Sequence, residues 1–450
     1  MRTRVIFGMV ALAASVVAVS PAAADPRAAS PDPLALVSAS QLGPSEGGAA
    51  AAPYGYMKLH ARGFAQAKAA ADARAGVRAA KPGHGGGGGG PTVSSYANVS
   101  PSFNAAYQSG LTPPDTTGAI GPGRYIETIN TGSLSSLTGI SGGLFGYSLS
   151  DPQMMWDAKT QRFYYSAVYY DAFLSDNGLA VGWSKTATPA SSADFCQYSI
   201  SLGSELPDYP KLGDSADFLL YGYNKFGSAG STYDGSEFAV LNKPPAGSSC
   251  APTSDFSVTT SGTLHNANNS LAATPVPANL VDDSNRTGYV VANADLTSVP
   301  SANFISVYSV NTSGTSNGIP VASIGGPKNV TVPSYSMPPS APEKGSSYLL
   351  DTLDGRLEAA VAAVDPTLAY NKIAVWTAHA VYGGAGAEER WYEIDPAAGS
   401  VVQAGSVTSP SLFIWNGAIS PDRANPGNSS TLFGDSMAMS TTPATPARPE

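Results

Sequence analysis

Residues 151–170 read DPQMMWDAKTQRFYYSAVYY, and this stretch decides the fold of the chain. It begins with Asp151 and Pro152, continues as a short apolar run and reaches a polar turn, DAKTQ, at residues 157–161. The following segment, RFYYSAVYY (162–170), is rich in the aromatic and β-branched residues that favour strands. The stretch therefore predicts two antiparallel strands joined by a turn.

The same order of features recurs along the chain. Similar units begin near Asp115, Asp151, Tyr209, Thr274, Gly355 and Trp415, at spacings from 36 to about 80 residues. A lone hairpin is unstable in water, so six of them imply a shared core. Radial blades or a sandwich could both supply that core, and the repetition favours blades. We expect an all-β domain, a β-propeller of about six blades.

Further strands are predicted wherever aliphatic and aromatic runs lie between clusters of turn residues. Besides 162–170, they are residues 125–130, 179–184, 218–224, 237–242, 289–294, 304–310, 358–364 and 373–381. After IWNGAISPD (413–422 region) one expects another strand pair, but the chain passes into TTPATPARPE and stops. Either a strand near residues 93–103 closes the last blade, or that blade is incomplete.

The N-terminal region predicts export followed by a leader. Arg2 and Arg4 precede an apolar run, and Ala22-Ala23-Ala24 forms a small-residue cleavage site, so we expect a signal peptide at 1–24, cleaved after Ala24. The run is too short to span a bilayer. Residues 25–91 form an Ala- and Gly-rich leader, helical over 57–80, that ends in the glycine run 85–90. The propeller should occupy 92–436, and a Pro/Thr-rich tail 437–450.

The role of the leader helix stays open at this stage. Its basic residues could contact an anionic cell surface or the acidic body, and it could equally be a solvated, flexible pro-segment. Residues 25–91 carry seven Lys/Arg against four Asp/Glu, whereas residues 92–450 carry fifteen against 29. An acidic body without a basic stripe argues against nucleic acid as a partner.

Three of the repeated motifs carry a family resemblance. PPDTTGAIGPGRYIETIN, SDPQMMWDAKTQRFYYSAV and YPKLGDSADFLLYGYN, together with RWYEIDP, resemble the signatures of secreted bacterial β-propeller proteins. Those proteins are similar in architecture to sialidase-type propellers with six or seven blades. The resemblance implies a secreted propeller and little about its chemistry. The S-x-D-x-G-x-T-W turn of sialidases is absent.

Candidate ligand residues lie at the starts of the repeats. Asp115, Asp151, Asp214 and Asp354 would gather around one mouth of a propeller channel, with Arg356 beside Asp354 at a strand start. Calcium is the ion that such oxygens would bind. Aspartate next to Pro, Thr or Gly is also ordinary turn chemistry, which satisfies backbone N–H groups. Both interpretations remain open.

Other chemical signatures are weak. The chain has no G-x-S-x-G elbow, no H-E-x-x-H motif and no P-loop. His379, within a strand, is better explained as a hydrogen-bonded core histidine than as a base. The tyrosines on two predicted strands are expected in the core, although alternate side chains could instead line a stacking face. Cys196 and Cys250 are candidates for a disulfide in an oxidising compartment.

The sequence predicts a secreted, extracellular β-propeller that acts as a binding or scaffold module for a glycan or a protein. We expect a monomer that does not span the membrane. The alternative is a carbohydrate-active hydrolase or lyase that uses carboxylates at the channel mouth. Propellers host both binders and enzymes, so the fold does not decide between them.

Overall fold

The computed structural model describes residues 36–38, 61–76, 117–128, 147–171, 173–227, 232–244, 250–280, 286–343, 347–368, 372–422, 434 and 436–444. The predicted signal peptide, the glycine run and Asp115 lie outside these residues. The chain divides into two compact units. The first unit holds the described parts of 1–57, 109–290 and 308–326, and the second holds those of 58–108, 291–307 and 327–450.

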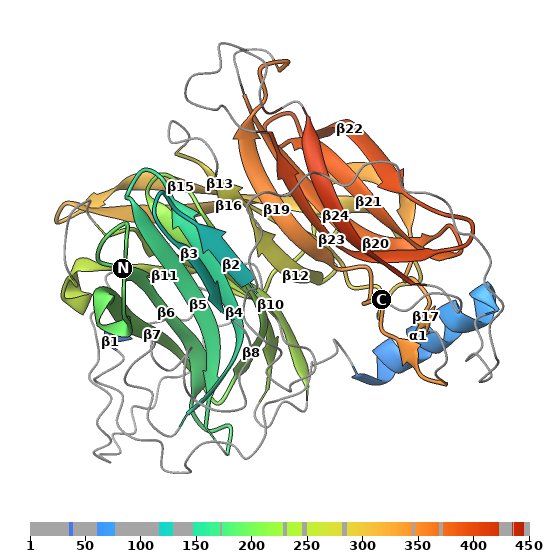
Figure 1. The fold of residues 1–450 in the computed structure, drawn as a ribbon, viewed down its shortest axis with the longest axis horizontal. Helices are drawn as coiled ribbons and strands as arrows, with labels where there is room; N and C mark the ends of the chain where they lie inside the picture. Colours follow the sequence, from blue (N-terminus) through green and yellow to red (C-terminus); the bar gives the residue numbers. More distant parts are fainter. Residues whose placement is uncertain are drawn as a thin grey trace, which may run out of the picture. The chain divides into compact units, whose positions relative to one another are not determined.

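In the first unit, two antiparallel sheets follow one another in chain order (Figure 1). The first sheet consists of β4 (Ser148–Asp157), β5 (Arg162–Tyr170), β6 (Asn177–Ser184) and β7 (Phe195–Gly203), with β1 (Leu36–Ser38) paired to β7. The second consists of β8 (Leu206–Asp214), β9 (Phe218–Phe226), β10 (Tyr233–Asn242) and β11 (Val258–Thr260). A hairpin of β2 (Thr117–Ile120) and β3 (Tyr125–Thr128) precedes them, and two short 3-10 turns lie at Ser192–Asp194 and Thr253–Asp255.

A third sheet consists of β12 (Ala272–Pro277), β14 (Gly288–Ala294), β15 (Ala302–Ser316) and β16 (Ile319–Tyr335), and β13 (Asn279–Leu280) follows β12 in the chain. The boundary between the units falls within β14, β15 and β16. Asn317 and Gly318 connect β15 to β16, with φ angles of 54° and 81°. An Asn-Gly pair with two positive φ angles matches the tight turn that hairpins favour.

The second unit contains four neighbouring antiparallel strands of a five-stranded sheet. These strands are β19 (Leu357–Val364), β20 (Ile373–Gly383), β21 (Gly386–Asp395) and β22 (Ser400–Val407). Two hairpins accompany it, β17 (Ala341–Pro342) with β18 (Leu349–Leu350), and β23 (Phe413–Pro421) with β24 (Met437–Ala444). Among the described residues the unit holds one α-helix, α1 (Ala61–Ala75).

The sheet that begins at β4 is covered on both faces. On one face Trp183 stacks on Tyr198, with ring centroids 4.7 Å apart, in a cluster that includes side chains of β9 and β10. On the other face Phe163 and Tyr165 pack against the β2–β3 hairpin. Every residue of β5 is buried. Because both faces are covered, the strand is a nearly continuous apolar run instead of an alternating one.

The tyrosines on β5 and β9 belong to the core. Tyr164, Tyr165, Tyr169, Tyr170, Tyr221 and Tyr223 are each at most 2% exposed. The expectation that they pack inside is therefore confirmed, and they line no exposed stacking face. A disulfide joins Cys196 to Cys250, and it ties β7 to the segment before β11.

In the second unit, the β19–β22 sheet packs against the β23–β24 hairpin. Trp376 and Trp391 stack with ring centroids 5.9 Å apart, and Ile419, Met437 and Met439 lie against them. These methionines belong to β24, within the segment that the sequence assigned to a Pro/Thr-rich tail. A strand pair was expected after IWNGAISPD, whereas one strand, Met437–Ala444, is described there, and it pairs with the strand that contains this motif. Its Thr and Pro residues made it look like a tail in the sequence.

The all-β fold class is confirmed, and the nine strands predicted by sequence coincide with β3, β5, β6, β9, β10, β14, β15, β19 and β20. The leader helix is also present, but it differs from the solvated segment that was one expectation. Phe64, Lys68 and Ala71 of α1 are buried. Within the described part of the chain, no helix has the length and apolarity needed to cross a membrane.

Candidate functional site

The first strands of three successive sheets share an unusual backbone feature. Asp151 in β4, Tyr209 in β8 and Thr274 in β12 have φ angles of 51°, 55° and 49°, and a proline follows each of them. Left-handed φ is uncommon for residues other than glycine and costs on the order of 1–3 kcal/mol. The three positions are the starts of three of the repeats recognised in the sequence.

Two of these positions are β-bulges. The pairing of β4 with β5 shifts between Ser150 and Gln153, and that of β8 with β9 shifts between Asp208 and Lys211. A bulge bends its strand and redirects side chains, and bulges are frequent next to functional sites. Since β4 packs beside β8, and β8 beside β12, the three strands lie next to one another in the first unit.

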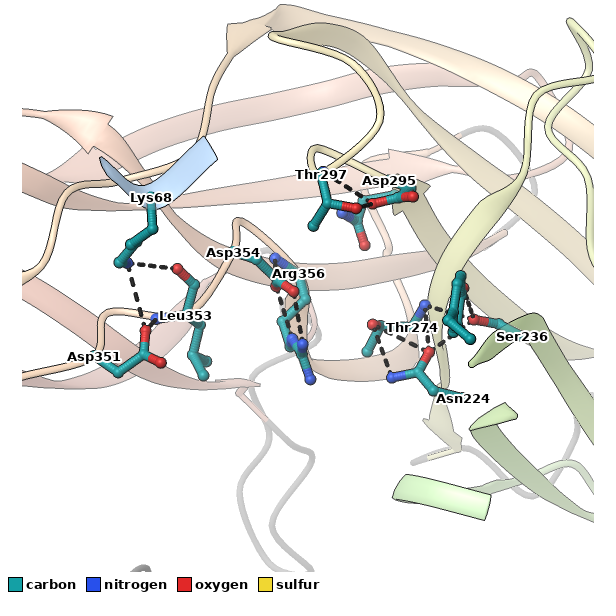
Figure 2. A network of polar contacts seen from close by, with 12 residues as sticks. Lys68, Asn224, Ser236, Thr274, Asp295, Thr297, Asp351, Leu353, Asp354 and Arg356 are labelled. Carbon is teal, nitrogen blue, oxygen red and sulfur yellow. Dashed lines mark hydrogen bonds and ion pairs between the residues drawn. The ribbon is translucent and has the colours of Figure 1, made fainter. Parts of the chain in front are cut away.

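At Thr274 the surrounding side chains supply hydrogen bonds to the irregular backbone. Its N–H donates to Asn224 Oδ1 (3.1 Å) and lies 3.2 Å from Ser236 Oγ, which itself donates to Asn224 Oδ1 (2.7 Å) (Figure 2). All three residues are buried. Asn224 and Ser236 thus replace the strand partner that the backbone of Thr274 lacks here.

At the other two positions the side chains reach the surface in part. Asp151 and Tyr209 are half-buried, as are Gln153 and Lys211 two residues further on. Lys211 Nζ lies 4.0 Å from the centroid of the Tyr209 ring, a close cation–π contact. These two adjacent strands therefore present a carboxylate, an amide, an aromatic ring and an ammonium group. We call Asp151, Gln153, Tyr209 and Lys211 the bulge cluster.

Asp214, one of the candidate ligand residues, is instead part of a buried ion triad. Lys243 Nζ lies 2.6 Å from Asp214 Oδ2 and 2.8 Å from Asp157 Oδ2. The N–H of Leu280 donates to the other oxygen, Asp214 Oδ1 (2.7 Å). Both oxygens of Asp214 are used inside the protein, so this residue does not present a ligand surface.

The two carboxylates of the triad have opposite pKa shifts. Burial raises the pKa of Asp214, and Lys243 offsets this rise only in part. Burial also acts on Asp157, but there the charge of Lys243 and hydrogen bonds from Thr160 and the Lys159 N–H outweigh it, so its pKa is lowered. Burial disfavours the ammonium form of Lys243, yet the two aspartates raise its pKa.

Asp354 and Arg356 form a second internal ion pair. Arg356 Nε and Nη2 donate to the two oxygens of Asp354 at 2.7 and 2.6 Å (Figure 2). Asp354 is 3% exposed and Arg356 is not exposed at all. The bidentate pair fixes the loop before β19 and offers no accessible arginine or carboxylate to a ligand.

The predicted set of four aspartates is distributed over both units and the residues outside those described, so its convergence stays a prediction. Asp115 lies outside the described residues, Asp151 and Asp214 belong to the first unit, and Asp354 belongs to the second. No group of three or more His, Cys, Asp or Glu side chains in the described part of the chain could hold a metal ion. The calcium expectation therefore finds no set of ligands there.

The second unit contains a buried acidic group that sequence reasoning missed. Glu389 in β21 is fully buried, and its pKa is raised well above the ordinary value by burial and then by the charge of Glu358 in β19. A Cβ added to Gly417 in β23 would overlap the Glu389 carboxyl, so the packing of β23 depends on that glycine. Glu389 is an enclosed acid in surroundings that favour its protonated form, and not an accessible one.

His379 in β20 is a core histidine, as expected. Its Nδ1 lies 2.9 Å from Gly355 O, and its Nε2 lies 3.2 Å from the Tyr392 hydroxyl. Burial, with a smaller contribution from Arg390, lowers the pKa of His379 to about 4. The ring is therefore neutral at pH 7 and has no route to act as a base on an external substrate.

No family model and no curated protein matches the chain. Solved structures that it resembles include an exo-beta-1,3-galactanase from Phanerochaete chrysosporium. A variant of that enzyme with beta-1,3-galactotriose has 10% identity and a TM-score of 0.30, and the enzyme with galactose has 11% and 0.28. Each match covers 66% of this chain and 60% of the galactanase chain, so less than two thirds of that enzyme is represented.

Proposed function

We propose that the successive antiparallel groups of strands are blades of a β-propeller. Five groups have the first strands β4, β8, β12, β19 and β23, one fewer than the six repeats suggested by sequence. Two observations support the proposal: strands within a sheet follow chain order, and in the first unit the first strands of three successive sheets lie side by side. An experimental structure without these five strands around one axis would contradict it.

We propose further that the chain is a secreted module that binds a carbohydrate through the bulge cluster. The observation that carries this proposal is the half-buried Tyr209 ring beside Lys211, on a strand adjacent to that of Asp151. An aromatic ring packs on the apolar face of a sugar, while carboxylate, amide and ammonium groups hydrogen-bond its hydroxyls. An extracellular location, expected from residues 1–24, would place the module among glycans.

The first ligand to test is beta-1,3-galactotriose, which the galactanase binds. Isothermal titration of the full chain with this and other neutral oligosaccharides should detect binding. Tyr209→Ala removes the ring and should weaken affinity at least about fivefold, since one aromatic contact is worth roughly 1 kcal/mol or more. Tyr348→Ala is the matched control, because Tyr348 is 78% exposed and lies outside the bulge cluster.

Equal affinities of wild type and Tyr209→Ala for an oligosaccharide would refute the proposal. Failure of every neutral glycan to bind would do the same. Loss of affinity in Tyr348→Ala alone would move the site to the second unit.

Glycoside hydrolysis is a second candidate, favoured by a partly accessible carboxylate in a strained backbone position. Asp151 would be the base or nucleophile, and Asp208, at the equivalent bulge of β8, would be the second carboxyl that the reaction needs. Asp208 is buried, whereas Asp151 is half-buried, so the two carboxyl groups lie in different surroundings. Release of galactose that persists in Asp151→Asn would exclude this assignment.

A further inference from the structure

The helix α1 inserts a lysine into the second unit. Lys68 lies near the middle of the helix and is 6% exposed. Its partners are 270 to 285 residues further along the chain, in the segments around Pro338 and Leu353. Phe64 and Ala71, one turn away on either side, are buried too, so one face of the helix is docked.

Oxygen atoms surround the ammonium group of Lys68. Nζ donates to Leu353 O (2.7 Å), Thr352 Oγ1 (2.7 Å) and Pro338 O (3.0 Å). It also lies 3.5 Å from Asp351 Oδ1, and Figure 2 shows it directed toward the 351–354 loop. A primary ammonium has three N–H donors and no acceptor, so the three oxygens match it completely.

The oxygens are held in place by contacts that do not involve Lys68. Asp351 Oδ1 accepts the N–H of Leu353 (3.0 Å), and Thr352 Oγ1 donates to Pro339 O (2.8 Å). Leu353 adopts a φ angle of 61°, and the next residue, Asp354, is clamped by Arg356. The loop would therefore keep its shape if the lysine were removed.

Burial and the nearby carboxylates act in opposite directions on the ammonium form of Lys68, and burial is the larger effect. Burial lowers the pKa of Lys68 to about 8, and Asp351, Asp354 and Asp72 act against that decrease. Because Asp351 is 34% exposed, the oxygen cluster is close to solvent. A buried ammonium is tolerated only with such hydrogen bonds and opposite charges.

We propose that Pro338 O, Thr352 Oγ1, Leu353 O and the Asp351 carboxylate form a binding site for a primary alkylammonium, and that Lys68 is its tethered ligand. The leader helix is held on the second unit by this ligand-like contact. A free amine of the same shape binds the site once the lysine side chain is absent. This site is separate from the bulge cluster and does not depend on its proposed function.

Chemical rescue of the full-length chain tests the site. Lys68→Ala removes Cγ, Cδ, Cε and Nζ, which together have the heavy atoms of n-propylammonium. We expect Lys68→Ala to melt at a lower temperature than wild type, and n-propylammonium to raise its Tm in a saturable way. Lys68→Met, whose side chain fills the same space without charge, should show no saturable rise.

Three controls separate specific binding from other effects. 1-Propanol tests simple filling of the cavity, and tetramethylammonium, which has no N–H, tests ionic strength. Lys328→Ala removes an exposed lysine that also donates to two carbonyls, Pro396 O (3.2 Å) and Ala397 O (2.8 Å), and it should show no rescue. Equal responses of Lys68→Ala to n-propylammonium and 1-propanol, or no response to either, would overturn the proposal.

If Lys68→Ala does not accumulate in folded form, its refolding yield from denaturant is measured with each additive. A higher yield with n-propylammonium than with 1-propanol or tetramethylammonium supports the site. Equal yields with the three additives refute it.

Discussion

Replacement of Lys243 by methionine tests how the first unit is held together. Lys243 follows β10, and its ammonium neutralises the carboxylates at the ends of β4 and β8 at distances of 2.8 and 2.6 Å. All three side chains are less than 10% exposed. Methionine keeps most of the volume and removes the charge, so Asp157 and Asp214 remain as two buried anions without a cation.

Loss of one partner from a buried ion pair typically costs about 3–5 kcal/mol, because the remaining charge is uncompensated. We expect a loss of that size for Lys243→Met at pH 7. Arg286→Met removes the surface pair with Asp217, in which Arg286 is 65% exposed, and should cost about 0–1 kcal/mol. Urea denaturation followed by tryptophan fluorescence compares the two variants.

The pH dependence of the stability difference between wild type and Lys243→Met shows whether the two carboxylates cause it. The lowered pKa of Asp157 in wild type contributes stability that is present above its unfolded pKa and is lost as the pH falls through the folded pKa. In Lys243→Met both carboxylates lose their cation, so their protonation at low pH relieves the variant while wild type loses stability. The difference between the two should therefore shrink from pH 7 to about pH 3.5. A difference that stays constant, or equals that of Arg286→Met, would refute the reasoning.

Two further predictions follow from buried or strained single residues. Glu389→Gln should gain stability relative to wild type as the pH rises from about 4 to 7, because a raised folded pKa means that wild type loses stability over that range. The Tm of both proteins is measured against pH, with Glu388→Gln, on the opposite face of β21, as the control. A difference in Tm that does not change with pH would contradict the raised pKa of Glu389. Asp151→Gly should relieve the left-handed backbone, which is worth about 0.5–1 kcal/mol in the free energy of unfolding, and should weaken oligosaccharide binding. Isothermal titration measures the affinity, and an unchanged affinity would show that Asp151 takes no part in binding.

The sequence predicted strands where both faces are covered and missed strands with mixed composition. RFYYSAVYY is apolar throughout, because the β2–β3 hairpin and the second sheet cover its two faces. In β24 (MAMSTTPA) the half-buried methionines, which pack on the cluster around Trp376, alternate with exposed Ala438 and Ser440, so the strand resembles a tail. A strand could therefore be recognised from its sequence when both of its faces are buried, because only then are nearly all of its residues apolar.

The internal ion pairs of Asp214 and Asp354 could not be predicted from sequence for a related reason. Asp214 and Asp354 look like turn aspartates or ligands from their neighbours in sequence, and the cation that neutralises Asp214 is 29 residues away. Lys68 is separated from its oxygens by up to 285 residues, so the composition of the helix could not distinguish a docked face from a solvated one. The starts of the repeats did carry a readable signal: Asp151, Tyr209 and Thr274 each precede a proline in what proves to be a strand. Proline inside a strand marks a bulge or an edge.

The distribution of strain among these three positions favours the bulge cluster as the ligand site. At Thr274 a buried network of Asn224 and Ser236 supplies hydrogen bonds that offset the left-handed backbone. At Asp151 and Tyr209 the same backbone brings a carboxylate and an aromatic ring partly to the surface, beside Lys211. Glycine adopts this conformation without strain, so an aspartate and a tyrosine keep it at a cost in stability. Their partial exposure beside Lys211 is the observation that makes these two positions, and not the buried Thr274, candidates for contact with a ligand.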